Sequence, residues 1–234
     1  MSAHNRIALK NLLDRFNFIN IFGEAGTGKT TFALQLVNNL LSYPEPGDIS
    51  SVWIQASESF PSKRLKTLFS NDQFLLNHLL HHIFIIPKKP TSDYYQLNSL
   101  LANLTTFQRG VPPNTRVLVI DNISHHLRYE LSQFSDIGDK VAILDDFFDS
   151  VIVPLTFFCE ESRITFILIH EVSYDPDQDK TVMFNHQLFE RINSLDIELK
   201  KDLFSRRHYI HFHTEYSSKS FEYTLRQKGI SIQI

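Results

Sequence analysis

The 234-residue sequence has little cysteine, glycine, tryptophan or methionine, and it contains no long apolar run. Its single cysteine, Cys159, can form no internal disulfide; because it falls in an apolar segment, we expect a buried thiol in a reducing compartment, the cytosol or the nucleus. No stretch approaches the roughly 18 apolar residues of a membrane span, and Met1–Arg6 leads into a mixed segment rather than a signal peptide. We therefore predict a soluble protein with no membrane partner.

The sequence also lacks a large excess of positive or negative charge. The 23 Lys and Arg residues nearly balance the 26 Asp and Glu residues, which gives a formal net charge of −3. This balance argues against a general nucleic-acid coat, although it permits a local basic patch. The 42% of hydrophobic residues and the 20 Phe residues favour a globular protein with a bulky aromatic core. The length allows one sizeable domain.

One segment carries the clearest chemical signal, a glycine-rich loop that follows an apolar run. Its residues are Gly23, Glu24, Ala25, Gly26, Thr27, Gly28, Lys29 and Thr30. Such a loop needs glycine because its backbone amides turn inward toward phosphates, and glycine adopts the required dihedral angles at low cost. The lysine reaches the β- and γ-phosphates, the next threonine hydroxyl binds Mg²⁺, and the following helix adds its dipole. We predict that these residues and Thr31 bind ATP, with Lys29 catalytic and Thr30 on the metal.

Apolar runs alternate with helical patterns through most of the chain. Short apolar runs predict buried strands at Phe18–Phe22, Ser51–Ala56, His82–Ile86, Arg116–Asp121 and Ile164–His170. Periodicity or a starting proline predicts helices at Leu9–Phe16, Lys29–Leu41, Pro61–Phe69, Tyr95–Phe107 and Val141–Cys159, the last kinked at Pro154. This alternation is typical of a mostly parallel sheet with helices on both faces.

The pattern changes after about residue 195. Leu195–Leu199, His208–His213 and Phe221–Leu225 alternate in polarity between polar turns, which predicts antiparallel strands. The sequence contains no internal repeat and no linker rich in Gly, Pro or Ser. It therefore predicts an α/β fold in one domain over residues 1–234: a mostly parallel central sheet with antiparallel C-terminal edge strands, preceded by an N-terminal helix within residues 1–16.

Asp121 is the natural companion of the glycine-rich loop. The four apolar residues Val117–Ile120 bring this acid to the carboxyl end of a central strand. In P-loop proteins an aspartate at this place holds Mg²⁺. The alternative is an aspartate that only ends the strand and caps a turn. Because the loop is present, we predict that Asp121 serves the metal together with Thr30.

Several stretches together resemble the RecA/RadA superfamily of recombinases, most closely the eukaryotic recombinase paralogues and the archaeal RadB proteins. Besides the glycine-rich loop, these stretches are Val52–Leu65, Val117–Glu130, Ile167–Val172 and Phe221–Ile230. They look like the family's strand with its Phe-Pro-x-Lys-Arg-Leu continuation, its second nucleotide motif, its strand ending in Asn-Gln-Val, and its terminal strand ending in Gly-Ile. The resemblance runs from about Asn17 to Ile230. It implies a RecA-like P-loop ATPase core without the separate N-terminal DNA-binding domain of full-length recombinases.

The sequence departs from this family at two positions. The family's catalytic Glu, which orients the attacking water, aligns with Ser57, and Glu58 follows one place later. Alternation along a strand would point Glu58 the other way, although it stays our candidate catalytic residue here. The position of the γ-phosphate-sensing Gln holds Glu171, whose carboxylate would repel phosphate. We therefore expect ATP binding to survive better than hydrolysis, which would be weak or partner-dependent.

The segment Ser173–Asn185 stands where recombinases carry their main DNA-contacting loop. It contains three Asp residues and one Lys, which makes a poor loop for a polyanion. Basic residues gather later in the chain, and they form either a solvated face or a contact with the DNA backbone. They are Lys200, Lys201, Arg206, Arg207 and Lys219.

Eleven histidines raise the question of a metal site. The clusters are His81–His82, His125–His126 and His208, His211 and His213. No cysteine accompanies any of them, so we interpret them as core or surface residues rather than metal ligands.

The resemblance implies an ATP-binding accessory factor of homologous-recombination DNA repair, with ATP and Mg²⁺ as cofactors. Such proteins pair with other recombinase paralogues and help the main recombinase assemble on single-stranded DNA, which this chain would bind weakly or only within the complex. The implied location is the nucleus, or the cytoplasm if the chain is an archaeal RadB-type regulator. Two alternatives stay open: a non-hydrolysing P-loop scaffold with ATP as a structural ligand, and a small-molecule P-loop kinase. We find no Arg-rich lid for the kinase.

Overall fold

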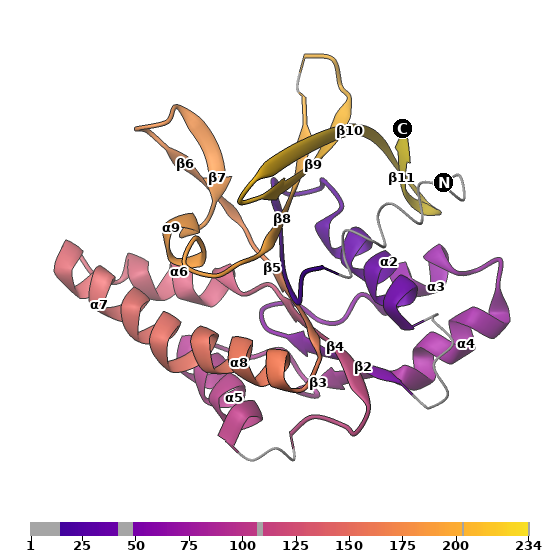
Figure 1. Ribbon diagram of the computed structural model, residues 1–234, viewed down its shortest axis with the longest axis horizontal. Coiled ribbons are helices and arrows are strands. Elements are labelled where there is room, and N and C mark those ends of the chain that lie inside the picture. The colour runs from indigo at the N-terminus through magenta and orange to yellow at the C-terminus, as the bar shows by residue number, and fades with distance from the viewer. Residues whose placement is uncertain (1–14, 42–48, 107–109, 203, 234) are drawn as a thin grey trace.

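The computed structural model describes residues 15–41, 49–106, 110–202 and 204–233. Most of the predicted Leu9–Phe16 helix lies outside these residues. Nine strands form one sheet: β1 (Phe18–Gly23), β2 (Ser50–Gln55), β3 (Ile83–Ile86), β4 (Thr115–Asp121), β5 (Thr165–Ile169), β8 (Leu195–Lys201), β9 (His208–Thr214), β10 (Ser217–Arg226) and β11 (Gly229–Gln233). Their order in space is β11-β10-β9-β8-β1-β5-β4-β2-β3 (Figure 1).

Six neighbouring strands, β8, β1, β5, β4, β2 and β3, pair in parallel, and β9, β10 and β11 extend the sheet with antiparallel pairs. This arrangement confirms the predicted fold class. One detail of the prediction is wrong. The strand at Leu195–Leu199 is antiparallel only to β9, because β8 returns to the sheet beside β1 and runs parallel to it. The antiparallel edge therefore begins one strand later than the alternation of polarity indicated.

Helices cover both faces of the sheet. One face carries α2 (Lys29–Leu41), α3 (Ser62–Leu68) and α4 (Gln73–His82). The other carries α5 (Tyr94–Thr106), α6 (Ser124–Ser132), α7 (Ile137–Phe147), η1 (Phe148–Ile152), α8 (Val153–Glu161) and α9 (His186–Phe189). Alternate residues of β5 explain the two layers: Phe166 and Leu168 pack into one core, while Ile167 and Ile169 pack into the other. A strand that is buried on both faces reads as the continuous apolar run seen in the sequence.

Three helices were not predicted, α4, α6 and the short α9, and one was predicted with a different start. The side chain of Asp72 caps α4 by accepting a hydrogen bond from the Leu75 amide at 2.9 Å, and the Asn122 side chain accepts one from the Ser124 amide at the start of α6. The long helix expected at Val141–Cys159 starts at Ile137, and a π-helical turn, η1, precedes Pro154. Proline lacks the N–H of a normal helical turn, so the wider turn replaces the expected kink.

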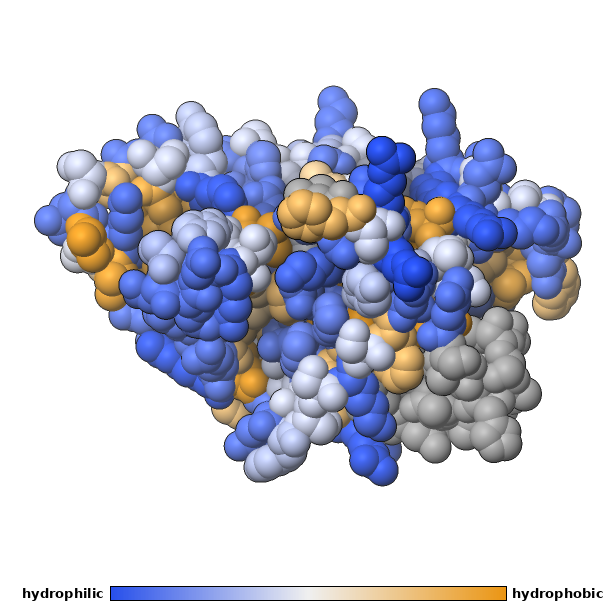
Figure 2. Space-filling model, turned by 90° about the horizontal axis from the view of Figure 1, so that it is seen from above, coloured by the Kyte–Doolittle hydropathy of each residue, from blue (hydrophilic) through white to orange (hydrophobic). Residues whose placement is uncertain are grey.

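The segment Ser173–Asn185, predicted as a loop, contains a two-stranded hairpin of β6 (Val172–Asp175) and β7 (Lys180–Met183). This hairpin rises from the carboxyl edge of the sheet, beside the end of β5 (Figure 1). Seen from above, that edge of the molecule is mostly hydrophilic, with separate apolar patches (Figure 2). The loops that carry the predicted chemistry therefore meet at one solvent-facing edge.

The structure also bears on the single cysteine and on possible membrane spans. Cys159 is 1% exposed, and burial raises the pKa of its thiol above the usual value, as expected for an unreactive core cysteine. Among the residues that the structure describes, no helix has both the length and the apolar character that a membrane span requires.

Candidate nucleotide-binding site

The glycine-rich loop joins the end of β1 to the start of α2, as the sequence predicted. Gly23, Gly26 and Gly28 have φ angles of +147°, +79° and +96°, a region that side chains with a Cβ rarely adopt. Gly23 faces a second restriction, because a Cβ there would lie 2.1 Å from the carbonyl oxygen of Leu199 in β8. The loop can therefore take this path only with glycine at these places, and its shape matches a phosphate cradle.

The C-terminal strands support the loop from the side. The Tyr223 hydroxyl of β10 donates a 2.7 Å hydrogen bond to the Thr27 carbonyl, and the Thr27 hydroxyl donates to the Glu24 carbonyl at 2.8 Å. The methyl groups of Leu225 lie 3.1 and 3.2 Å from the place where a Cβ on Gly28 would stand. These contacts hold the loop against a strand nearly 200 residues away in the sequence.

Lys29 bends back over the loop. Its Nζ donates to the carbonyl oxygens of Gly23 and Glu24 at 2.7 and 3.1 Å. Burial lowers the pKa of its ammonium group, while nearby carboxylates oppose this shift, Asp121 first and Glu171 second. Two carbonyls and diffuse negative charge are weak partners for a half-buried cation. A triphosphate would supply stronger ones, and this fit supports the predicted role of Lys29 toward the β- and γ-phosphates.

The predicted metal ligands lie together. The Thr30 hydroxyl donates a 3.0 Å hydrogen bond to Oδ2 of Asp121, which lies at the carboxyl end of β4. Burial raises the pKa of Asp121 to about 6; the Thr30 hydrogen bond lowers it, and the charge of Glu58 adds to the increase. A hydroxyl and a carboxylate at hydrogen-bond distance are the oxygen donors that Mg²⁺ prefers. Thr30 and Asp121 would hold a magnesium ion, which would supply positive charge to offset the Asp121 carboxylate and the phosphates.

Ser57 and Glu58 follow β2, in a bend where the strand has already ended. The alternation used to orient Glu58 therefore does not apply here. The Gln55 side chain shapes this bend, since it donates to the Pro87 carbonyl at 2.6 Å and accepts from the Phe60 amide at 2.7 Å. Glu58 is exposed, and its charge acts on both Asp121 and Lys29. The structure thus places the carboxylate beside the site, and its catalytic role stays a prediction.

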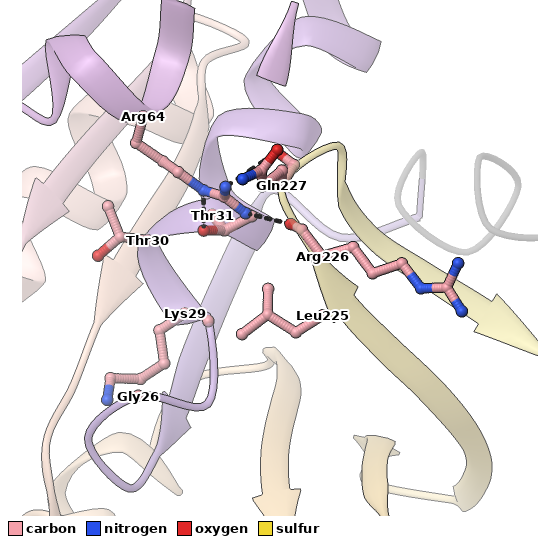
Figure 3. Close-up of a pocket in the computed structure, with 9 residues that line it drawn as sticks. Gly26, Lys29, Thr30, Thr31, Arg64, Leu225, Arg226 and Gln227 are labelled. Atoms are coloured by element: carbon pink, nitrogen blue, oxygen red, sulfur yellow. Dashed lines mark hydrogen bonds between the residues drawn. The ribbon is translucent and has the colours of Figure 1, made fainter. Parts of the chain in front are cut away.

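A cavity of about 430 Å³ opens beside the loop. Its lining comes from the loop, α2, α3 and the turn between β10 and β11 (Figure 3). The Arg64 guanidinium crosses it, donating to the Thr31 hydroxyl and to the carbonyls of Arg226 and Gln227, each at 2.9 Å. The Lys29 side chain extends away from Arg64 in Figure 3, although both residues line the cavity. The cavity has the size and position to take the base and sugar of a nucleotide.

Glu171, the residue in the expected sensor position, lies in a polar cluster at the end of β5. Asn122 Nδ2 donates to its Oε1 at 3.1 Å, His125 Nδ1 lies 3.4 Å from the same oxygen, and Arg128 Nε lies 3.1 Å from Oε2. Arg128 also donates to the Val172 carbonyl at 2.8 Å and stacks on the Phe184 ring, 4.5 Å from its centroid. The pairing with Arg128 offsets much of the repulsion that the sequence argument assigned to this carboxylate.

A buried chain of hydrogen bonds connects this cluster to β8. Asp196 accepts from Asn20 Nδ2 at 2.7 Å, so Asn20 Oδ1 is free to accept from His170 Nε2 at 3.0 Å. His170 Nδ1 then faces the Ser124 hydroxyl at 3.5 Å, and that hydroxyl accepts the Glu171 amide at 3.2 Å. Burial lowers the pKa of His170 to about 3, which keeps the ring neutral. The carboxylate of Asp196 thus sets the direction of every donor in the chain.

Several histidines have well-defined surroundings in the structure. His126 is buried and its Nε2 lies 3.1 and 3.0 Å from the carbonyls of Ala56 and Thr91. His211 and His213 share a face of β9, with ring centroids 5.9 Å apart. No group of three or more His, Cys, Asp or Glu residues within the described ranges has the geometry of a metal site.

Sequence reasoning missed the residues that come from distant segments. It gave no role to Arg64, Tyr223, Asn122 or Arg128, although Arg64 lies in the Phe-Pro-Ser-Lys-Arg-Leu stretch. That stretch was the available signal for Arg64, which lies in the first turn of α3 and reaches Thr31 of α2. For Tyr223 no local signal existed.

Lys29→Ala should abolish binding of ATP, because it removes the cation that the loop directs toward the phosphates. We expect no measurable heat in an isothermal titration with Mg²⁺–ATP, while the thermal unfolding midpoint without nucleotide stays close to that of the native chain. Lys63→Ala, an exposed lysine at the start of α3, is the matched control and should bind normally. An unchanged affinity of Lys29→Ala would overturn the assignment of the site.

Asp121→Asn should stabilise the empty protein and weaken Mg²⁺-dependent nucleotide binding. The pKa of this acid is raised to about 6 in the folded state, so its ionisation opposes folding increasingly as pH rises from about 4 to 6. Removing the charge should raise the free energy of unfolding at neutral pH by on the order of 2–3 kcal/mol. Denaturant titrations at pH 5 and 8, chosen on either side of about 6, should show a larger gain at the higher pH. An equal gain at both would contradict this account.

Comparison with known families matches residues 14–168 of the chain to the family described as AAA domain. The matched segment is more than half of the 234 residues and contains both the glycine-rich loop and Asp121. A comparison with curated proteins finds no match. AAA domains are P-loop domains that generally bind ATP with Mg²⁺, which agrees with the cradle, the lysine and the oxygen ligands found here. The chain belongs to the AAA domain family of P-loop nucleoside triphosphatases.

Proposed function

We propose that this protein is an ATP-binding accessory factor of homologous recombination, a RecA-like recombinase paralogue that assists filament assembly on single-stranded DNA. The observation that carries the proposal is the combination of a well-formed phosphate and metal site with an altered catalytic edge. Lys29, Thr30 and Asp121 are in place, but Ser57 stands where the resembling family has its water-orienting Glu. Such a site suits a subunit whose nucleotide acts more through binding than through turnover.

The fold agrees with the proposal without carrying it, because many functions share a P-loop core. The C-terminal strands β9 to β11 extend the sheet with antiparallel pairs, and the β10–β11 turn lines the candidate nucleotide cavity. The proposal extends to partners: other recombinase paralogues and the main recombinase, within a hetero-oligomer. It also extends to location, in the nucleus or, for an archaeal RadB-type regulator, in the cytoplasm.

A second candidate is a non-hydrolysing scaffold in which ATP is a structural ligand. The Glu171–Arg128 pair favours this alternative. The carboxylate of Glu171, at the sensor position, already contacts the Arg128 cation and two further polar groups, Asn122 and His125. A sensor needs a group that is free to change partners when the γ-phosphate leaves. The pair would have to break before Arg128 could serve the phosphate.

The isolated protein should hydrolyse ATP far more slowly than the roughly 1–100 s⁻¹ of active P-loop kinases. A positioned base is typically worth about 10²–10⁴ in rate, and Ser57 cannot provide one. Ser57→Glu should therefore raise steady-state turnover, while Ser59→Glu, an exposed position two residues later, should not. Phosphate-release assays measure both. Turnover of the native chain in the kinase range, or no increase in turnover for Ser57→Glu, would contradict the hypothesis that position 57 lacks a catalytic base.

The accessory role itself is tested with the recombinase of the source organism. Adding this chain with its co-purified paralogue should speed recombinase assembly on single-stranded DNA, followed by fluorescence anisotropy of the labelled strand. Lys29→Ala should lose this effect at equal protein concentration, because it cannot bind the nucleotide. If the native chain changes neither the rate nor the stability of assembly, the recombination proposal fails, although the assignment of the nucleotide site would stand.

A further inference from the structure

The loop between β8 and β9 is strongly basic in a chain whose net charge is negative. Lys200, Lys201, Arg206 and Arg207 flank it, and all four are exposed. Its single acid, Asp202, holds the turn: its carboxylate accepts from the Phe204 amide at 3.0 Å and from the Ser205 hydroxyl at 2.6 Å. These bonds lower the pKa of Asp202, so it stays ionised as a structural anchor. The described residues on either side of position 203 therefore concentrate positive charge at this end of the sheet.

An aromatic ring stands among these charges. Phe204 is 101% exposed, the most exposed of the large hydrophobic residues that the structure describes. A phenylalanine gains nothing from full exposure to water, whereas burial of its ring would stabilise the protein. An exposed ring between two pairs of basic residues has the composition of a site that stacks on a base while its neighbours contact phosphates.

A row of rings leads away from the loop along β9. Tyr209, His211 and His213 alternate on one face of this strand, with ring centroids 6.4 and 5.9 Å apart. Three carboxylates share this face, and each has a partner: Asp196 accepts from Asn20 at 2.7 Å, Glu198 lies 3.7 Å from His213, and Glu222 lies 3.3 Å from Arg207. The rings are therefore half-exposed beside acids that already have partners.

The loop lies at the carboxyl edge of the sheet because β8 runs parallel to β1. The register pairs Gly23 with Leu199, so Lys200 and Lys201 follow directly beside the glycine-rich loop. The β6–β7 hairpin rises from the same edge (Figure 1). It carries Asp175, Asp177 and Asp179 against one lysine, which excludes it as the main contact for a polyanion.

We propose that the β8–β9 loop and the adjoining row of rings on β9 form the surface on which this chain binds single-stranded nucleic acid. This inference rests on the proposed function and deepens it, because it places the contact on a different element from the hairpin. Lys200 shares the face of the rings, whereas Lys201 pairs with His208 and points to the other face at the end of β8. Both lysines and Arg206 meet phosphates of a strand that passes across the end of the loop, and Phe204 stacks on an unpaired base. Arg207 stays with Glu222 and orients the loop. Single strands fit because duplex DNA keeps its bases paired and offers none to Phe204.

The test uses the purified full chain without nucleotide and two labelled probes of equal length, an oligothymidylate and an oligouridylate. Fluorescence anisotropy is measured from low to near-physiological salt. Three phosphate contacts predict a slope of log K against log salt near −2, at about −0.7 per contact for single strands. Binding of both probes supports the shared surface, and a preference between them shows whether DNA or RNA fits it better.

Two variants separate the two parts of the surface. The double variant Lys200→Gln with Lys201→Gln should bind more weakly and reduce the salt slope by about 1.4. Phe204→Ala should weaken binding by about 5- to 150-fold, the range for one stacked base, with an unchanged slope. The matched controls are Lys88→Gln with Lys89→Gln, an exposed basic pair after β3, and Phe74→Ala, a ring 87% exposed on α4. Both controls should bind like the native chain.

Each other outcome overturns the proposal. If the native chain does not bind either probe at low salt, the proposed binding surface is wrong. Equal losses in the control pairs show nonspecific charge, and equal binding of a duplex or of polyglutamate shows a surface for another partner. Titration with Mg²⁺–ATP distinguishes a failure of this surface from a failure of the proposed nucleotide-dependent function. The loop variants should bind ATP normally, whereas Lys29→Ala should bind the oligonucleotide but not ATP.

Discussion

The close approach of β8 to the end of β1 is the constraint on which the rest of the structure depends. The carbonyl of Leu199 occupies the space where any side chain at position 23 would stand, so the glycine-rich loop and the eighth strand determine each other's position. Once β8 is placed there, β9 and β10 follow as antiparallel neighbours, and Tyr223 reaches the loop carbonyl at Thr27. The C-terminal strands β8 and β10 are thereby part of the candidate nucleotide site.

The same edge collects charges that oppose one another. Asp121 lies buried near Lys29, and Glu171 adds a second carboxylate that affects this lysine. Without ligand phosphates, the protein relieves part of this charge by raising the pKa of Asp121 and by pairing Glu171 with Arg128. A bound Mg²⁺–nucleotide would replace both arrangements with stronger ones. The empty site is therefore destabilised by its own function, which is a common feature of preorganised sites.

Much of this could be predicted from the sequence because it is encoded locally. Buried strands such as β5 read as apolar runs, and a P-loop occupies eight consecutive residues. Helices α4 and α6 were missed because histidines and other polar residues interrupt their apolar pattern. Pairing partners are not local either. The parallel return of β8 to β1, and with it Tyr223, depends on which strands become neighbours, and that choice is made by the whole core.

Two separate contacts connect β8 to the loops at the carboxyl edge of the sheet, one through the backbone of Leu199 and one through the side chain of Asp196. The backbone contact at Leu199 is steric and fixes the loop whatever is bound. The chain from Asp196 through Asn20 and His170 instead ends at the amide of Glu171, beside the groups that would face a γ-phosphate. Because its donors all point toward Asp196, the chain has one consistent direction, and each hydrogen bond polarises the next. The strand that leads into the basic loop is therefore joined by hydrogen bonds to the polar cluster around Glu171.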